Sequence, residues 1–126
     1  MEITHFDDSE RISAGPVKAE VVKVEDDVTT YGECVVFYFN VTDMDGKTLD
    51  GMRVYCSTPS LVPLSKLGKI VRALVPKVTQ KTIGGIKTTE NLNKVATGRT
   101  VTLEAYENDA GYMRLRLPGA SSLGGK

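Results

Sequence analysis

A chain of 126 residues with no net charge is long enough for one domain and too short for two of ordinary size. No apolar run is long enough to span a membrane, and the polar N-terminus lacks the apolar core of a secretory signal, so we expect a cytoplasmic protein. We expect one domain over residues 1–126: a loose arm at 1–13, a barrel at about 16–118 and a flexible Gly/Ser-rich tail at 119–126.

Charge is unevenly distributed along the chain. Residues 1–27 carry three basic and eight acidic side chains, and residues 63–94 carry seven basic side chains and one acidic one. A basic segment of this kind favours a polyanionic partner. The opposite charges of the two segments could equally neutralise each other in the fold.

The two cysteines, Cys34 and Cys56, lie in strand-like segments. A disulfide between neighbouring strands is geometrically possible, but a reducing compartment favours two buried thiols. Neither cysteine has a second ligand near it in sequence, so we expect no metal site and no cofactor.

The first half of the chain predicts three strands. Residues 16–25 alternate, and the apolar phase switches at Val21 and Val22, which indicates a bulge. Residues 26–32 are expected to form a loop. Residues 33–43 alternate most clearly and end at Asp45-Gly46, a pair suited to a tight turn because glycine accepts positive φ. A third strand follows at about residues 47–57.

The second half predicts one helix and two strands. Apolar residues at intervals of three and four predict a helix over residues 60–74, with Ser60 as N-cap, Leu64 on the apolar face and Pro76 as terminator. The proximity of the helix to a barrel end would explain Gly68. Residues 79–97 have no clear period and are expected to form a long loop, with at most one turn near residues 89–93. Residues 100–107 and 112–117 predict a closing hairpin.

This order (three strands, a helix, two strands) and the segment Gly98-Arg99-Thr100-Val101-Thr102-Leu103 before the last hairpin resemble small OB-fold proteins of the type that binds single-stranded nucleic acid. The expected fold is all-β with one helix, a five-stranded OB-like barrel. The resemblance implies a groove across the outer face of strands two and three, with the last strand beside the third.

The ligand-facing residues follow from which side of the second strand is core. Phe37 and Phe39 are the more apolar set and are expected inside, which leaves the intervening Tyr38 outside. Tyrosine rings stack on unpaired bases, and arginine binds phosphate or stacks, so interleaved residues of these types suit non-sequence-specific binding. The candidate nucleic-acid-binding residues are Tyr31, Tyr38, Asn40, Arg53, Tyr55, Lys77, Lys81, Lys87, Tyr112, Arg114 and Arg116.

The chain has one histidine and no nucleophile–base set, so we do not expect an enzyme. The function we expect is binding of single-stranded nucleic acid, with DNA favoured over RNA, as an accessory of replication, recombination or repair. The alternative is an OB module that binds protein, or a homo-oligomer subunit, because tyrosine and arginine are also enriched in protein interfaces.

Overall fold

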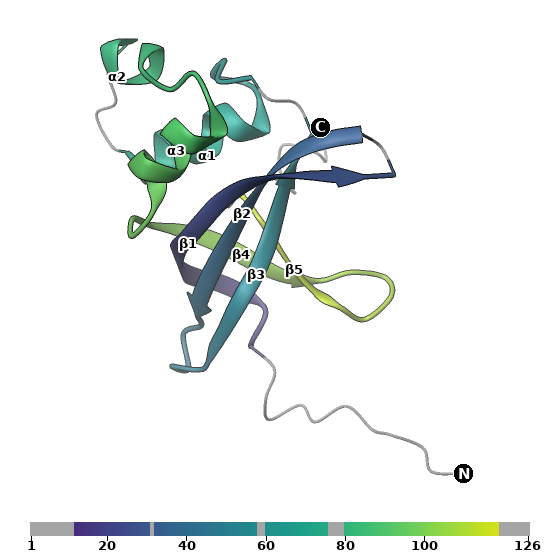
Figure 1. The fold of residues 1–126 in the computed structure, drawn as a ribbon. Helices are drawn as coiled ribbons and strands as arrows, with labels where there is room; N and C mark the ends of the chain where they lie inside the picture. Colours follow the sequence, from purple (N-terminus) through teal and green to yellow (C-terminus); the bar gives the residue numbers. More distant parts are fainter. Residues whose placement is uncertain (1–11, 31, 58–59, 76–79, 119–126) are drawn as a thin grey trace.

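The computed structural model describes residues 12–30, 32–57, 60–75 and 80–118. Its strands form a single antiparallel sheet in the order β3-β2-β1-β4-β5, which curls into a nearly closed barrel with the three helices grouped at one end (Figure 1). The predicted all-β barrel with one main helix is confirmed. The elements are β1 (Gly15–Thr29), β2 (Gly32–Thr42), β3 (Thr48–Cys56), α1 (Lys66–Leu74), α2 (Gln80–Gly84), α3 (Thr89–Ala96), β4 (Thr100–Glu107) and β5 (Met113–Arg116).

The core is built on the inner face of β2. Phe37 and Phe39 are both 0 % exposed, and their rings stack with centroids 5.8 Å apart. Alternate residues of a strand point to opposite faces, so Tyr38 between them lies on the outer face, half-buried. The predicted inward and outward sets of this strand are confirmed at these three positions. Farther along the outer face, Val36 and Cys34 are also buried, which the alternation did not predict.

The expected bulge in β1 is present, because the register with β2 shifts between Val21 and Lys23. The expected loop at residues 26–32 is wrong. Asp26 pairs with Val35, Val28 pairs with Glu33, and the hairpin turns only after Thr29. Strand pairing uses main-chain groups, so acidic side chains that depress strand propensity do not prevent the hairpin from extending.

The expected start of α1 at Ser60 is also wrong. The helix begins at Lys66, and Ser65 is its N-cap, since its hydroxyl oxygen accepts a hydrogen bond from the Gly68 amide at 2.9 Å. Leu64 lies in the preceding loop and is 86 % exposed. Apolar residues also occur in the loop before the helix, because Leu61 packs against the core although it is not helical.

Gly68 is required by the loop before the helix rather than by the barrel end. A Cβ built on Gly68 would lie 2.0 Å from the backbone oxygen of Val62 and 2.9 Å from that of Leu61. The loop therefore crosses directly over the glycine. Arg72 fastens the same crossing, because its Nη1 donates to the Leu61 oxygen at 2.7 Å.

Residues 80–96 form two helices where the sequence predicted a loop. In α3, the Thr88 hydroxyl caps the first turn, and Leu92 and Ala96 are buried. Asn93 Oδ1 accepts a hydrogen bond at 2.7 Å from the amide of Val24, just past the bulge in β1. The weak period of this segment reflects a short helix with a narrow apolar face. None of the helices in the described ranges is both long and apolar enough to cross a bilayer.

The turn between β2 and β3 is organised by the carboxylate of Asp43, which is 6 % exposed. Its Oδ2 accepts from the Ser13 amide at 2.7 Å, and its Oδ1 accepts from the amides of Asp45 and Lys47, each at 2.9 Å. These donors, Ser13 first, lower the pKa of Asp43 despite its burial. The carboxylate thus ties the chain before β1 to the turn.

We predict that Gly68→Ala destabilises the protein, because the new methyl group meets backbone oxygens that cannot move aside as a side chain does. Overpacking of this kind costs about 1–3 kcal/mol. Urea unfolding should show a lower midpoint. The matched control is Gly84→Ala in α2, where a Cβ meets nothing within 4 Å. An equal effect of the two substitutions would contradict the proposed loop crossing.

We predict that Asp43 contributes stability that is lost in acid. Its pKa is lower in the folded than in the unfolded chain, so its contribution is complete above the unfolded value of about 3.9 and disappears as the pH falls through the folded value. Asp43→Asn should lower the free energy of unfolding at pH 7 and flatten its decline in acid. The exposed Asp50 serves as the control, and Asp50→Asn should lower the free energy of unfolding at pH 7 less than Asp43→Asn does.

Candidate nucleic-acid interface

The outer face of β1, β2 and β3 places a tyrosine between two cations. Tyr38 pairs with Lys23 on one neighbouring strand and with Arg53 on the other. The Lys23 ammonium lies 4.6 Å from the centroid of the Tyr38 ring, and the Arg53 guanidinium carbon lies 5.2 Å from it. The predicted Tyr38 and Arg53 therefore share one surface, and Lys23 joins them.

Two further groups complete this surface, which we call the Tyr38 face: Lys23, Glu25, Tyr38, Arg53 and Tyr55. Arg53 Nη1 donates to the Tyr55 hydroxyl at 3.4 Å, and Lys23 Nζ lies 3.0 Å from Glu25 Oε1. The Tyr38 face thus carries two cations and one anion beside two aromatic rings.

The pKa values of these groups agree with that geometry. The bond to Tyr55 raises the pKa of Arg53, and the bond to Lys23 lowers that of Glu25. Partial burial, together with the nearby Glu25 carboxylate, raises the pKa of the Tyr38 phenol. At neutral pH the face therefore presents ionised Glu25 and Arg53 and an un-ionised Tyr38.

The Tyr38 ring is not a bare stacking platform, because cations from both neighbouring strands already contact it. A cation–π contact at an exposed site is worth about 0.5–1 kcal/mol. Stacking of an unpaired base on an aromatic side chain is worth about 1–3 kcal/mol. A base can therefore displace one of the cations, which then remains close enough to pair with phosphate.

The arginines of β5 form a second cation–aromatic set on the outer face. Arg116 Nε lies 2.6 Å from Glu104 Oε1, and the guanidinium lies 4.3 Å from the centroid of Tyr106. Arg114 is exposed and pairs with Tyr106 across the β4–β5 ladder. Within the described ranges β5 pairs only with β4, although the β3 and β5 edges lie near each other. β5 was expected beside β3, where its arginines would extend the same face. The two strands do lie near each other, but they do not pair.

The remaining predicted residues are distributed differently. Asn40 Oδ1 accepts from the Gly51 amide at 3.2 Å, near the register shift between β2 and β3, and so has a structural role. Tyr112 is 66 % exposed beside the β4–β5 turn. Lys81 and Lys87 are exposed on and after α2, at the helical end of the barrel and not among the described contacts of Tyr38. Tyr31 and Lys77 lie outside the described residues.

Sequence reasoning missed Lys23 and Tyr106. Tyr106 follows directly from alternation, because Leu103 and Ala105 point inward. Lys23 follows from the predicted bulge, which returns Val24 to the inner face and so turns Lys23 outward. Two basic residues of α1 have structural bonds instead: Lys66 Nζ donates to the main-chain oxygen of Tyr55 at 2.8 Å, and Arg72 Nη1 donates to that of Leu61 at 2.7 Å.

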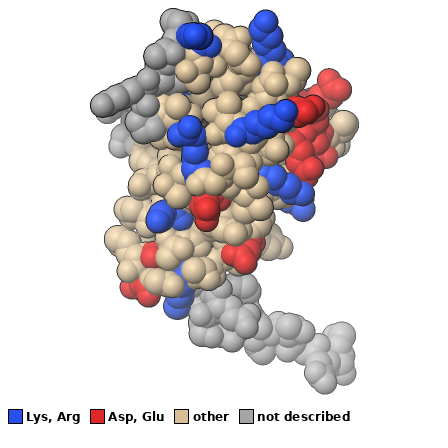
Figure 2. All heavy atoms as spheres, turned by 60° about the vertical axis from the view of Figure 1, so that its left-hand side comes forward, with Lys and Arg blue, Asp and Glu red and all other residues tan. Residues whose placement is uncertain are grey.

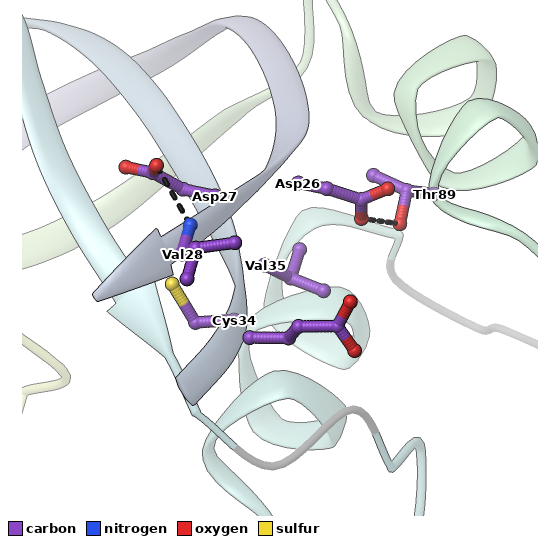
Figure 3. A pocket seen from close by; sticks show the side chains of 7 residues that line it. Asp26, Asp27, Val28, Cys34, Val35 and Thr89 are labelled. Atoms are coloured by element: carbon purple, nitrogen blue, oxygen red, sulfur yellow. Dashed lines mark hydrogen bonds between the residues drawn. The ribbon is translucent and has the colours of Figure 1, made fainter. Parts of the chain in front are cut away.

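On the face that Figure 2 shows, the basic side chains are spread apart, and a group of acidic side chains gathers at one edge. A pocket of about 400 Å³ lies against the β1–β2 hairpin and includes three carboxylates, those of Asp26, Asp27 and Glu33 (Figure 3). No group of three or more potential metal ligands occurs in the ranges the structure describes.

The two cysteines are free and buried, as expected, and they occupy opposite faces of the sheet. Cys56 belongs to the core and pairs with Val35, so Cys34, one residue away, points to the other side. Burial raises the pKa of Cys56 to about 11. Burial, and then the carboxylate of Asp27, raise the pKa of Cys34.

Comparison with models of known protein families finds no match to this chain, and neither does a search of curated proteins.

We predict that neither thiol reacts quickly in the folded protein, because the reactive thiolate is disfavoured at both positions. Ellman's reagent at pH 7 should modify the native chain slowly and should modify both cysteines once urea unfolds it. Rapid reaction of one thiol without denaturant would show that the corresponding side chain is accessible. Non-reducing electrophoresis should detect no internal disulfide.

Proposed function

We propose that the protein binds single-stranded DNA, without sequence preference, across the Tyr38 face of an OB-like barrel. The observation that carries the proposal is the contact of Tyr38 with Lys23 and Arg53, a ring and two cations held on adjacent strands. Ring faces and cations are the two elements that single-strand binding surfaces combine.

The position of the Tyr38 face in the barrel supports the proposal. It lies on the outer side of the central strands, where the OB resemblance implies the groove. The order of strands and main helix is compatible with that resemblance. The aromatic and basic residues of β4 and β5 lie on the outer face as well, and they offer a second contact region for a strand that continues beyond Tyr38.

The chemistry of the face favours contacts that ignore base identity. A tyrosine ring stacks on any base, and lysine and arginine bind phosphates that every nucleotide carries. Glu25 holds Lys23 in place through an ion pair, but it also repels phosphate. We therefore propose that the backbone passes nearer to Arg53 than to Glu25, and that the protein serves as an accessory in replication, recombination or repair.

The test is fluorescence anisotropy with labelled oligo-dT at two salt concentrations. We expect binding that weakens as salt rises, because phosphate contacts release counterions. Arg53→Ala should weaken binding. It should also reduce the steepness of the plot of log K against log salt concentration by the amount expected for the loss of about one phosphate contact. Tyr38→Phe keeps the ring and should bind nearly normally, whereas Tyr38→Leu should bind less tightly.

The matched control is Lys94→Ala. Lys94 is exposed on α3, where its Nζ lies 3.6 Å from Glu90 Oε1. This helix is not part of the sheet that carries the Tyr38 face. Its loss should leave the salt slope unchanged. Absence of oligo-dT binding by the native chain, or an equal effect of the Lys94 and Arg53 substitutions, would contradict the proposal.

A further inference from the structure

The β1–β2 hairpin extends beyond the part of the sheet that the core fills. On its inner face the pairs follow in order: Val24 with Phe37, Asp26 with Val35, then Val28 with Glu33. The first pair is buried, whereas Val28 at the far end is 72 % exposed. The hairpin therefore carries an inner face of alternating apolar and acidic side chains out to solvent.

Two pockets adjoin along this inner face. The pocket of about 400 Å³ lies against the hairpin, and a second of about 170 Å³ lies between α1 and the start of α3. Val35 and Thr89 line both pockets, so the two form one continuous groove, which we call the hairpin groove. Leu67 and Leu92 line its inner part.

The charge of the hairpin groove is opposite to that of a nucleic-acid site. Asp26, Asp27 and Glu33 line its outer part, and Lys87 is the basic residue among its described lining. Asp26 and Asp27 have local partners, because Thr89 Oγ1 donates to the Asp26 carboxylate and the Val28 amide donates to that of Asp27 (Figure 3). The bond from Thr89 holds the Asp26 carboxylate at the mouth of the groove, where Asp26 and Glu33 repel phosphate and attract basic groups, whereas Asp27 lies on the outer side of the hairpin with Cys34.

One edge of the hairpin has no neighbouring strand in the described ranges, and its Val24 and Val28 amides donate to the side chains of Asn93 and Asp27 instead. β4 pairs with β1 only from Gly15 to Glu20, and among the described residues no strand pairs with the later part of β1 on that side. An unpaired strand edge accepts an extended peptide through main-chain hydrogen bonds. The residues from Asp26 to Val28 combine this edge with the wall of the groove.

We propose that the hairpin groove binds an extended segment of a partner protein in which apolar and basic side chains alternate. The apolar side chains occupy the inner part over Val35, and the basic ones face Asp26 and Glu33, which lie on the same face of the hairpin. Because the Tyr38 face lies on the opposite side of the sheet, one molecule can hold DNA and the partner segment together. This proposal does not depend on DNA binding.

The test uses the full ¹⁵N-labelled chain and a short, end-capped synthetic peptide that alternates lysine with valine. We expect the amide signals of Val28, Val35 and Thr89 to shift on titration, and those of Lys23 and Arg53 to stay. A peptide with glutamate in place of lysine should cause no shifts. Shifts confined to the Tyr38 face, equal shifts with both peptides, no shifts at all, or self-association of the chain at the groove would overturn the proposal.

Substitutions at two exposed positions separate the apolar contribution to peptide affinity from the electrostatic contribution. Glu33→Lys should lower the affinity for the lysine–valine peptide about fivefold, which corresponds to the loss of about 1 kcal/mol from a surface charge pair. Val28→Ser should weaken it by a similar factor, because it removes apolar contact without changing charge. The matched control is Val22→Ser, at a 43 % exposed valine of the same strand and outside the described lining of the groove.

The same variants distinguish the two proposals. Glu33→Lys and Val28→Ser should keep the oligo-dT affinity of the native chain or, for the added lysine, raise it. Arg53→Ala should keep the peptide affinity. A loss of both affinities in any one variant, with the fold intact by circular dichroism, would contradict the assignment of the two ligands to separate faces.

Discussion

The bulge in β1 is the constraint on which both surfaces depend. Up to Glu20 the strand pairs with β2 and β4, and Val21 makes the last main-chain bonds on the β4 side, with Gly98 and Arg99. Past the register shift, the Asn93 side chain binds the amide of Val24 in place of a strand. The strand then continues with β2 alone. Its separation from β4 produces the extended hairpin, and the change of phase places Lys23 on the outer face beside Tyr38.

The two surfaces divide the charges of a neutral chain. The outer face brings Lys23 and Arg53 to one aromatic ring, whereas the inner face of the hairpin gathers the carboxylates of Asp26 and Glu33. The two sets project from opposite faces of the sheet, and salt in the solvent limits the reach of each field to about 8–10 Å. Position in the fold rather than in the sequence decides which of the described charges act together, because Lys23 and Arg53, far apart in the sequence, meet at Tyr38.

Side chains that could bind a ligand also serve the fold. Arg116 pairs with Glu104, Arg72 binds the loop that crosses Gly68, and Lys66 binds the main chain of β3. Each of these cations satisfies a carboxylate or a carbonyl oxygen, which lowers its value as a free phosphate ligand. Arg53 differs, because its bond is to a neutral phenol and its positive charge remains uncompensated by that partner. This difference is why Arg53 is the residue on which the DNA-binding proposal is tested.

The sequence by itself determined the strand pattern, the inward Phe37 and Phe39, the outward Tyr38 and the all-β barrel, because alternation and turn residues act locally. Only the tertiary structure decided the start of α1, the helices at residues 80–96 and the length of the hairpin. Leu64 has helical spacing, but Ser65 caps the helix after it; Asn93 is polar, but its bond to Val24 anchors α3. The predicted bulge turns Lys23 outward, but its contact with Tyr38 depends on the register of β1 with β2, which only the folded hairpin fixes because it joins main-chain groups of two strands.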